Sequence, residues 1–315
     1  MKLTEVIAHY GALKKAMGER FDSAASVLHT FCRQLAPDIN IADIHADHVA
    51  AFLAGTGPVT RYWHRKHSVL RGLYTYAISR GIVAESPLPP MVPKLSPRFV
   101  PHIYTHEELR RLVRTTPSYR PHSHKLEPHT LRTMILLLYG AGLRVSEAVA
   151  LALGDVDLPN ALLTVRNTKF HKTRLVPLGA DLQQVMTQYL AQRQAAGHAQ
   201  RPGTPFFVLR CGTPVSVQIV QQNFRCLCEY AGVRRSDGAR YQPRLHDLRH
   251  SFAVHRLTSW YRQGADVQTL LPYLSTYLGH VNLAATQVYL TMTPELLQEA
   301  ARRFQQYAFE ERYHD

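Results

Sequence analysis

A proline-rich stretch divides this 315-residue sequence into two unequal parts. Proline fixes φ and has no backbone N–H, so a chain with a proline every few residues cannot continue as a helix and favours extended conformations. We therefore expect a linker over residues 86–103, a smaller domain before it (1–85) and a larger domain after it (104–315). The prolines of this stretch are Pro87, Pro89, Pro90, Pro93, Pro97 and Pro101.

The part before the linker has the pattern of a small helical bundle. Apolar residues recur there at helical spacing, and a glycine follows the last periodic stretch, as is common at the end of a helix. We expect helices over residues 3–17, 22–35, 47–54 and 58–80.

The last of these helices places positive charge on one face and apolar side chains on another. Arg61 and Arg65 share the first face with Ser68, whereas Leu70 and Leu73 lie on the second. By itself, this pattern fits a solvated helix face as well as a contact with DNA.

The part after the linker combines further helices with one β-hairpin. Residues 155–177 hold the apolar and β-branched runs of two short strands on either side of a turn. We therefore expect a mainly α fold with a small β-hairpin sheet in the larger domain, which is an α+β class. The expected helices cover residues 105–114, 129–139, 180–195, 217–231, 247–262, 283–290 and 294–309.

The composition indicates a negatively charged partner. The formal net charge is +14 and the pI is about 9.8, which suits nucleic acid or an acidic membrane surface. The longest apolar run, residues 134–143, is too short to cross a bilayer, and the N-terminus lacks the pattern of a signal peptide. The cysteines do not have the spacing of a disulfide framework, so we expect a reducing compartment; they are Cys32, Cys211, Cys226 and Cys228.

Three short motifs in the larger part carry residues suited to phosphate chemistry. The first, A-G-L-R-V-S-E, contains Arg144, and the second, H-D-L-R, contains His246 and Arg249. The third, L-G-H, ends at His280 and is followed nine residues later by Tyr289. Each motif alone would be ordinary: a helix start, a hydrogen-bonding pair on a helix surface, or a half-buried tyrosine. Their order and spacing together indicate a function.

These residues could together cleave a phosphodiester with a tyrosine nucleophile. Arginine stays protonated and its planar fork of donors matches a phosphate, so Arg144 and Arg249 would clamp the phosphate and stabilise the transition state. Tyr289 would attack, but a phenol with a pKa of about 10 needs a nearby proton acceptor. His246 is the better candidate for this acceptor, and His280 would donate to a phosphate oxygen.

From about residue 105 to its end, the chain resembles the tyrosine recombinase family of phage integrases and Xer-type recombinases. The resemblance implies a two-domain, C-shaped DNA clamp. It also implies that Tyr289 attacks the scissile phosphate, forms a 3′-phosphotyrosine and releases a 5′-hydroxyl, which a lysine of the β-hairpin protonates. Counting back from the V-P-L strand favours Lys169 for this lysine. Lys172 stays a competing candidate, because the glycines that usually flank the family's lysine are absent.

Two stretches depart from the family pattern. Residues 257–277 are longer than the common spacing, and residues 116–129 form a Pro/His-rich insert. His122, His124 and His129 of the insert could bind a metal ion. The segment lacks helical periodicity and has basic neighbours, so we interpret it as a loop that touches DNA and expect no metal site.

The resemblance also bears on how the chain grips DNA. The family has a helical DNA-binding domain before the linker, which favours DNA contact for Arg61 and Arg65. Lys94 and Arg98 in the linker could follow a DNA backbone, and Lys172 in the hairpin would contact a phosphate.

Further properties follow from the resemblance alone. The partner would be a double-stranded DNA recombination site, on which four copies assemble through the C-terminal helix (residues 294–309). The alternative is that this helix folds back on its own domain. A second, related recombinase could take part. No cofactor is needed, because the covalent link keeps the bond energy. We expect a protein of the bacterial cytoplasm, associated with the nucleoid and not with a membrane.

Other functions stay open at this level. A type IB topoisomerase would use much the same residues without a partner duplex, and a DNA-binding accessory protein could keep the fold but lack catalysis. A basic RNA-binding helical protein is a third possibility, but no aromatic stacking motif is present. Within recombination, the insert and the many histidines favour a mobile genetic element over chromosome-dimer resolution.

Overall fold

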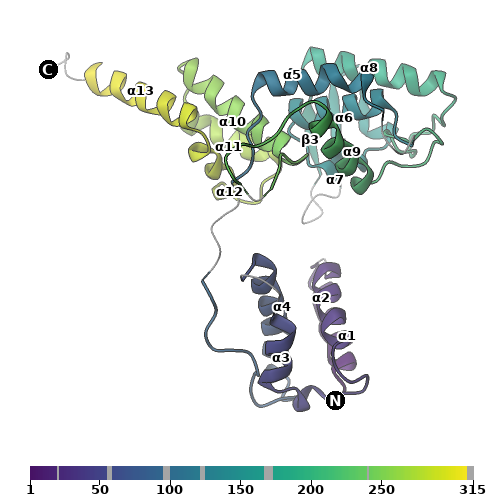
Figure 1. Ribbon diagram of the computed structural model, residues 1–315, viewed down its shortest axis with the longest axis vertical. Coiled ribbons are helices and arrows are strands. Elements are labelled where there is room, and N and C mark those ends of the chain that lie inside the picture. The colour runs from purple at the N-terminus through teal and green to yellow at the C-terminus, as the bar shows by residue number, and fades with distance from the viewer. Residues whose placement is uncertain are drawn as a thin grey trace. The chain divides into compact units, whose positions relative to one another are not determined.

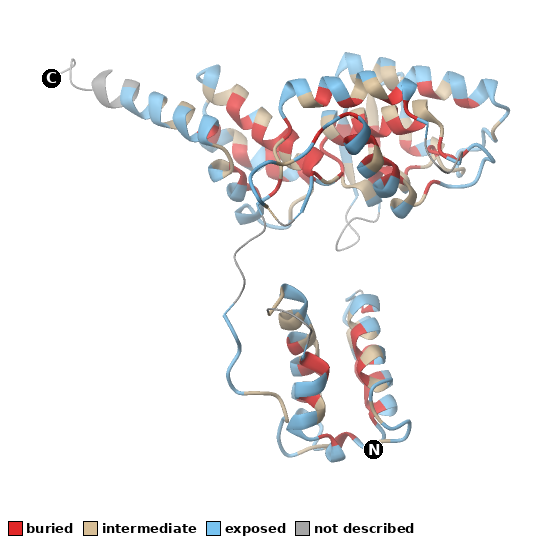
Figure 2. Cartoon of the chain, in the orientation of Figure 1, coloured by how far each residue is buried: buried red, intermediate tan, exposed pale blue. Residues whose placement is uncertain are grey.

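The computed structural model describes residues 1–19, 21–54, 59–94, 100–120, 125–166, 173–239 and 241–310, with side chains as far as residue 305. The chain forms two compact units, Met1–Phe99 and Val100–Asp315 (Figure 1). The buried residues form separate cores in the two units (Figure 2). Within the described residues, no helix is both long and apolar enough to cross a membrane.

The first unit is a helical bundle around an aliphatic and aromatic core. The predicted helices are present with ends that differ by a few residues: α1 (Leu3–Ala16), α2 (Asp22–Cys32), α3 (Ala46–Leu53) and α4 (Arg61–Ser79). α1, α2 and α4 pack on one another, and α3 packs on α4. Phe31 of α2 and Phe52 of α3 lie in contact, with ring centroids 4.9 Å apart.

α4 buries one face and exposes a basic face. The side chain of Thr60 caps its N-terminus by accepting a hydrogen bond from the backbone N–H three residues on, at 3.4 Å. Leu70 and Leu73 are fully buried, whereas Arg61 and Arg65 are exposed. α4 contains no aspartate or glutamate, so its exposed side carries only positive and neutral groups.

The second unit is mainly α with one small antiparallel sheet. The strand order is β1-β2-β3, and Leu163 at the centre pairs with Val156 on one side and Val176 on the other. The predicted fold class is confirmed, and a short third strand widens the predicted hairpin. The elements are α5 (His106–Thr115), α6 (Pro128–Gly140), α7 (Val145–Val149), β1 (Val156–Asp157), β2 (Leu162–Val165), β3 (Arg174–Pro177), α8 (Ala180–Ala195), α9 (Val217–Tyr230), α10 (Asp247–Arg262), α11 (Val267–Leu278), α12 (Ala284–Gln287) and α13 (Pro294–Glu310).

α6 is the central helix of this unit and leads directly to the candidate site. It packs on α8, α9 and α10. Just after it, Gly142 adopts the left-handed conformation with φ +60°, which turns the chain so that Arg144 stands at the N-cap of α7. A Cβ at residue 142 would lie 2.6 Å from Phe252 of α10 and 2.9 Å from Leu278 of α11. The close approach of these helices therefore requires glycine at this turn.

The sequence prediction was wrong about residues 267–278, where it placed no helix. α11 forms there although Pro272 lies inside it, and a proline normally disrupts a helix. The carboxylate of Asp266 caps the helix by accepting from the backbone N–H of Gln268 (3.0 Å) and of Thr269 (3.3 Å). The leucines of α11 pack into a core shared with α10, the chain around Tyr289 and the start of α13. This tertiary burial outweighs the local effect of the proline.

α13 packs on its own unit from its start as far as Arg303. Leu296 is fully buried, and the guanidinium of Arg303 donates to the carbonyls of Gly264 (2.7 Å) and Ala265. The predicted alternative, in which this helix folds back on its own domain, therefore describes this part of the helix. Leu297 and Phe304 of the same helix are exposed.

The turn at Gly142 gives a prediction about stability. We expect Gly142→Ala to lower the free energy of unfolding by about 2–5 kcal/mol, because the left-handed conformation costs about 1–2 kcal/mol and the overlap with Phe252 adds about 1–3 kcal/mol. Gly197→Ala is the matched control, because Gly197 has φ +73° and a Cβ added there would meet nothing within 4 Å. This variant should show only the cost of the left-handed conformation. Urea denaturation of both variants measures the difference, and equal losses would refute the packing argument.

Candidate active site

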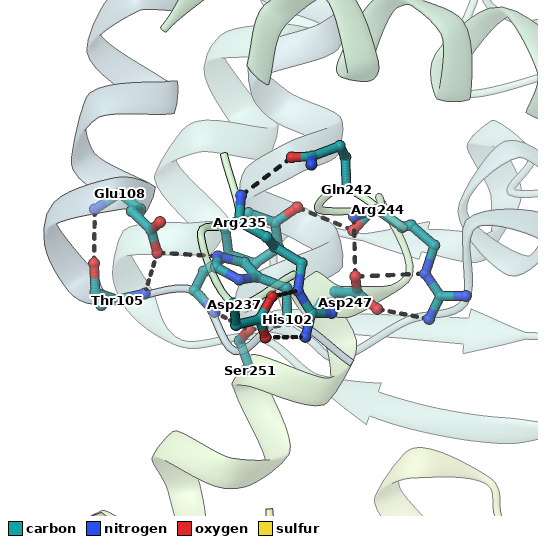
Figure 3. Close-up of polar contacts among 10 residues, drawn as sticks. His102, Thr105, Glu108, Arg235, Asp237, Gln242, Arg244, Asp247 and Ser251 are labelled. Atoms are coloured by element: carbon teal, nitrogen blue, oxygen red, sulfur yellow. Dashed lines mark hydrogen bonds and ion pairs between the residues drawn. The ribbon is translucent and has the colours of Figure 1, made fainter. Parts of the chain in front are cut away.

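A network of buried polar contacts fixes the N-terminus of α10, where the H-D-L-R motif lies (Figure 3). The fully buried carboxylate of Asp247 accepts from the backbone N–H of Arg244 (2.9 Å) and from its guanidinium (2.9 Å). Ser251 donates to the Asp247 carbonyl and accepts from the backbone N–H of Tyr104, each at 2.8 Å. The motif is therefore tied both to the loop before α10 and to the segment before α5.

That segment is itself held by a capping box on α5. The backbone N–H of Thr105 donates to the Glu108 carboxylate (2.8 Å), and the backbone N–H of Glu108 donates to the Thr105 hydroxyl (3.1 Å) (Figure 3). His102 contacts the same carboxylate at 3.2 Å. Nearby, Arg235 is paired with Asp237 at 2.6 Å. These contacts stabilise the scaffold on which the H-D-L-R motif stands.

Arg249 is buried and is bound mainly by carbonyl oxygens. It is 2% exposed, and its Nη1 and Nη2 donate to the carbonyls of Gly142 and Leu278, each at 2.6 Å. Burial, followed by the nearby charge of Arg144, lowers the pKa of Arg249 to about 10. The group still carries its charge at neutral pH, so a positive charge lies in a poorly solvated place.

Arg144 is held by the acidic residue three positions after it. Its backbone N–H donates to Glu147 Oε2 (3.0 Å), and its Nη1 donates to Glu147 Oε1 (2.6 Å). Its Nη2 donates to the carbonyl of Gly279 (3.1 Å). The side chain stays 30% exposed, so part of this guanidinium can meet a ligand.

Glu147 and Arg174 are site residues to which sequence reasoning assigned no role. Arg174, the first residue of β3, binds both carboxylate oxygens of Glu147, at 3.0 and 2.8 Å. Burial alone would raise the pKa of Glu147, but the hydrogen bonds from Arg174 and Arg144 outweigh burial and hold it at about 2. The available signal was the glutamate three residues after Arg144, which is the spacing of a helix capping box.

His280 and Tyr289 face each other on the other side of this cluster. Their rings stack with centroids 6.0 Å apart, and His280 Nδ1 lies 2.7 Å from the hydroxyl of the buried Thr286. Tyr289 is 3% exposed and lies beside the Arg249 guanidinium. Burial raises the pKa of the Tyr289 phenol, and the interaction with Arg249 only partly offsets this effect.

Two further histidines line the same cluster. The rings of His246 and His250 meet edge to face at 4.8 Å, and His250 lies 5.6 Å from the Tyr289 ring. His250 Nδ1 is buried without a hydrogen-bond partner. Burial, together with neighbouring charges, lowers the pKa of both histidines, and also of His280, to about 4. At neutral pH these rings are uncharged and can accept protons. The sequence motif did not single out His250.

The structure therefore brings together five of the predicted catalytic residues, namely Arg144, His246, Arg249, His280 and Tyr289. The predicted lysines Lys169 and Lys172 lie outside the described residues, between β2 and β3.

No described contact joins the remaining predicted residues to this cluster. Arg98 of the linker and His122 and His124 of the insert are also outside the described residues, whereas Lys94 is exposed. His129 lines a cavity together with the basic residues Arg120, Arg132 and Arg210. Among the described residues, no group of three or more potential metal ligands occurs.

The sequence model described as "Phage integrase family" matches residues 103–295. The chain belongs to this family. Its matched region contains all of the clustered residues described above.

Two relatives extend the match along the chain. An integrase/recombinase of Sinorhizobium fredii, y4rE, is 35% identical over 301 residues, which cover 96% of this chain and 95% of the relative. The tyrosine recombinase XerD of Corynebacterium glutamicum is 32% identical over 236 residues, covering 74% of this chain and 71% of that protein. The chain is therefore a tyrosine-type site-specific recombinase. The relatives do not favour the topoisomerase alternative.

Solved structures show the same fold. The Tn1549 transposon integrase in complex with transposon right-end DNA superposes with a TM-score of 0.68 at 15% identity, covering 98% of this chain and 100% of that chain. A lambda integrase tetramer bound to a Holliday junction gives a TM-score of 0.65 at 16% identity, covering 92% of this chain and 77% of that chain.

The buried histidines of this integrase-family fold give a prediction about pH. A histidine with a pKa of about 6.5 when unfolded and about 4 when folded binds more protons in the unfolded state between these values. Stability is therefore complete above pH 6.5 and is lost as the pH falls toward 4. We expect the free energy of unfolding to drop by about 2 kcal/mol or more between pH 7 and pH 5.

His255, which bonds to Tyr139 (2.9 Å) outside the catalytic cluster, offers a test of this origin. His255→Gln should reduce the loss between pH 7 and pH 5, whereas replacement of the exposed His29 by Gln should not. Urea denaturation at the two pH values measures both. If His255→Gln lost as much free energy of unfolding between pH 7 and pH 5 as the unmodified protein, the assignment of this loss to the buried histidines would be contradicted.

Proposed function

We propose that this recombinase cuts and rejoins DNA through a 3′-phosphotyrosine formed on Tyr289. The observation that carries the proposal is the burial of this tyrosine in contact with Arg249, His250 and His280. A phenol beside neutral imidazoles and arginines has proton acceptors and phosphate-binding cations next to it, which a tyrosine nucleophile needs because burial raises its pKa. The phosphotyrosine link keeps the energy of the broken phosphodiester bond. The 5′-hydroxyl of a partner strand can therefore attack this link and reverse the reaction.

The arginines act on the phosphate. Arg144 has an exposed edge, and Arg249 presents a desolvated charge beside the tyrosine. A phosphodiester gains negative charge on its non-bridging oxygens during attack, and pre-placed donors stabilise that charge without reorganisation. The same charges favour the phenolate form of Tyr289, which offsets part of the effect of its burial.

The histidines move and hold protons. His246 and His250 are neutral at pH 7 and can accept the proton of the tyrosine. If the hydroxyl of Thr286 donates to His280 Nδ1, the neutral His280 ring carries its proton on Nε2, where it can donate to a phosphate oxygen. An arriving phosphate anion would raise the pKa of each of these rings.

We propose that a lysine of residues 167–172, between β2 and β3 in the sequence, protonates the leaving 5′ oxygen. Lys169 is our candidate, from its position before the V-P-L strand, and Lys172 would contact a phosphate. β3 is tied to the phosphate-binding side chains through Arg174, which supports a proton donor close to β3 in the sequence.

We further propose that both units bind the same duplex. The exposed Arg61 and Arg65 of α4 support this role for the first unit, since the helix carries no acidic residue. Lys94 and Arg98 would add phosphate contacts along the linker.

Assembly would follow on the DNA. The solved lambda integrase is a tetramer on a Holliday junction, and we propose the same number of copies here, associated through residues 294–309. The exposed Leu297 and Phe304 of α13 supply apolar contact surface. A second, related recombinase could occupy part of the assembly.

The biological role that we propose is movement of a mobile genetic element in bacterial DNA, in the cytoplasm beside the nucleoid. The fold is shared with the integrase of the Tn1549 transposon, and the Pro/His-rich insert sets this chain apart from the common Xer pattern.

The covalent step can be tested with a nicked suicide duplex, which traps the phosphotyrosyl adduct. We expect Tyr289→Phe to abolish the adduct while DNA affinity changes by no more than about a factor of three, because only the attacking oxygen is removed. Tyr273→Phe, at a tyrosine that is 69% exposed, should form the adduct normally. An adduct that survives in Tyr289→Phe would refute the assignment.

The contribution of α4 can be measured in the inactive Tyr289→Phe background. We expect Arg61→Ala/Arg65→Ala to weaken binding and to reduce the slope of log K against log salt by about 2, since each phosphate contact contributes about 1. Arg33→Ala, at an exposed arginine after α2, should leave the slope unchanged. An unchanged slope in the double variant would exclude α4 from the interface.

A further inference from the structure

We propose that Arg174 is a positioning residue for the cleavage reaction, which sets the charge and the geometry of the phosphate clamp without touching the DNA. The proposal rests on the proposed function of Arg144 and His280. The side chain of Arg174 is 11% exposed and that of Glu147 is 7% exposed, so the pair lies behind the reactive surface.

Arg174 keeps the group formed by Arg144, Glu147 and itself positively charged. Glu147 accepts hydrogen bonds from Arg144 and from Arg174. With Arg144 alone, the carboxylate at 2.6 Å would cancel the positive charge that the phosphate must meet. The bidentate contact with Arg174 supplies a second cation, so the trio carries one net positive charge and Arg144 remains attractive to a phosphate.

The second observation concerns geometry. Arg174 Nε donates to the carbonyl of Tyr277 (3.0 Å) at the end of α11, two residues before Gly279 and three before His280. Arg144 binds Glu147 and also the Gly279 carbonyl. Arg174 thus connects two parts of the site. One is the Glu147 carboxylate, which orients Arg144, and the other is the turn that carries His280.

The third observation is how closely the guanidinium packs on this turn. Gly279 has φ +66°, and a Cβ there would lie 2.8 Å from Arg174 Nη1 and 3.0 Å from its Cζ. The glycine of the L-G-H motif therefore has two functions: it supplies the left-handed conformation and it leaves room for Arg174.

Lysine cannot reproduce this arrangement, because it lacks the planar fork that binds two carboxylate oxygens and a carbonyl together. In Arg174→Lys we expect the single-turnover cleavage rate at saturating DNA to fall about 10–100-fold, the scale of a displaced catalytic group. DNA affinity should change by less than about a factor of three. A rate within a factor of about two of the unmodified enzyme would overturn the proposal.

The control is Arg193→Lys. Arg193 is also buried and donates to backbone carbonyls, those of Phe206 (3.2 Å) and Pro205 (3.1 Å), but it lies away from the site. This variant should lose stability to urea but keep its cleavage rate. If Arg193→Lys slowed cleavage as much as Arg174→Lys, the slow cleavage of Arg174→Lys would reflect general destabilisation, and the positioning role would be overturned.

Two further measurements separate positioning from other roles. The double variant Arg174→Lys/Glu147→Gln should cleave no more slowly than the slower single variant, because the two residues act as one unit. If the rate defects of the two single variants multiplied in the double variant, the positioning role would be overturned. A substrate with sulfur at the bridging 5′ position hardly needs leaving-group protonation. It should not rescue Arg174→Lys, and rescue would place the effect on the proton donor instead.

Amide hydrogen exchange tests the geometry without any cleavage. The N–H groups of Gly279 and His280 bond to Thr276 (2.9 Å) and Ser275 (3.0 Å). Their exchange should be faster in Arg174→Lys and unchanged in Arg193→Lys. Unchanged exchange in Arg174→Lys would refute the positioning role even if the unmodified protein formed no covalent adduct, so this failure is distinct from failure of the proposed function.

Discussion

The site depends on the way in which three arginines bind the carboxyl end of α11. The last carbonyls of a helix have no partner within the helix and carry partial negative charge. The carbonyls of residues 277, 278 and 279 accept from Arg174, Arg249 and Arg144 respectively. These dipoles hold mutually repelling cations together, and Glu147 is the carboxylate that binds two of them. The cluster therefore keeps positive charge for a phosphate.

The same concentration of charge sets the protonation state of the other groups. Burial and the nearby arginines keep His246, His250 and His280 neutral, while burial keeps Tyr289 protonated despite Arg249. A phosphate entering this site would neutralise part of the positive field and raise the pKa of the histidines.

Tertiary packing decided several features against local preference. α11 forms in spite of Pro272 because its leucines fill a shared core. α13 is held on its own unit by Leu296 and by Arg303. Helical periodicity alone could not distinguish this arrangement from docking on a second copy. Gly142 and Gly279 look like ordinary turn residues in the sequence, but each also leaves room for a side chain from a distant element.

The sequence by itself determined the fold class and named five of the side chains that lie together in the folded chain. Phosphate chemistry restricts which side chains can serve, and their order along the chain is visible without a structure, so Arg144, Arg249 and Tyr289 could be named in advance. Only the tertiary structure decided that Arg174 and Glu147 belong with them. An arginine on a strand and a glutamate on a helix can pair with many partners, and the folded chain alone brings these two within hydrogen-bond distance. The burial that lowers the pKa of the three histidines and raises that of Tyr289 has the same tertiary origin.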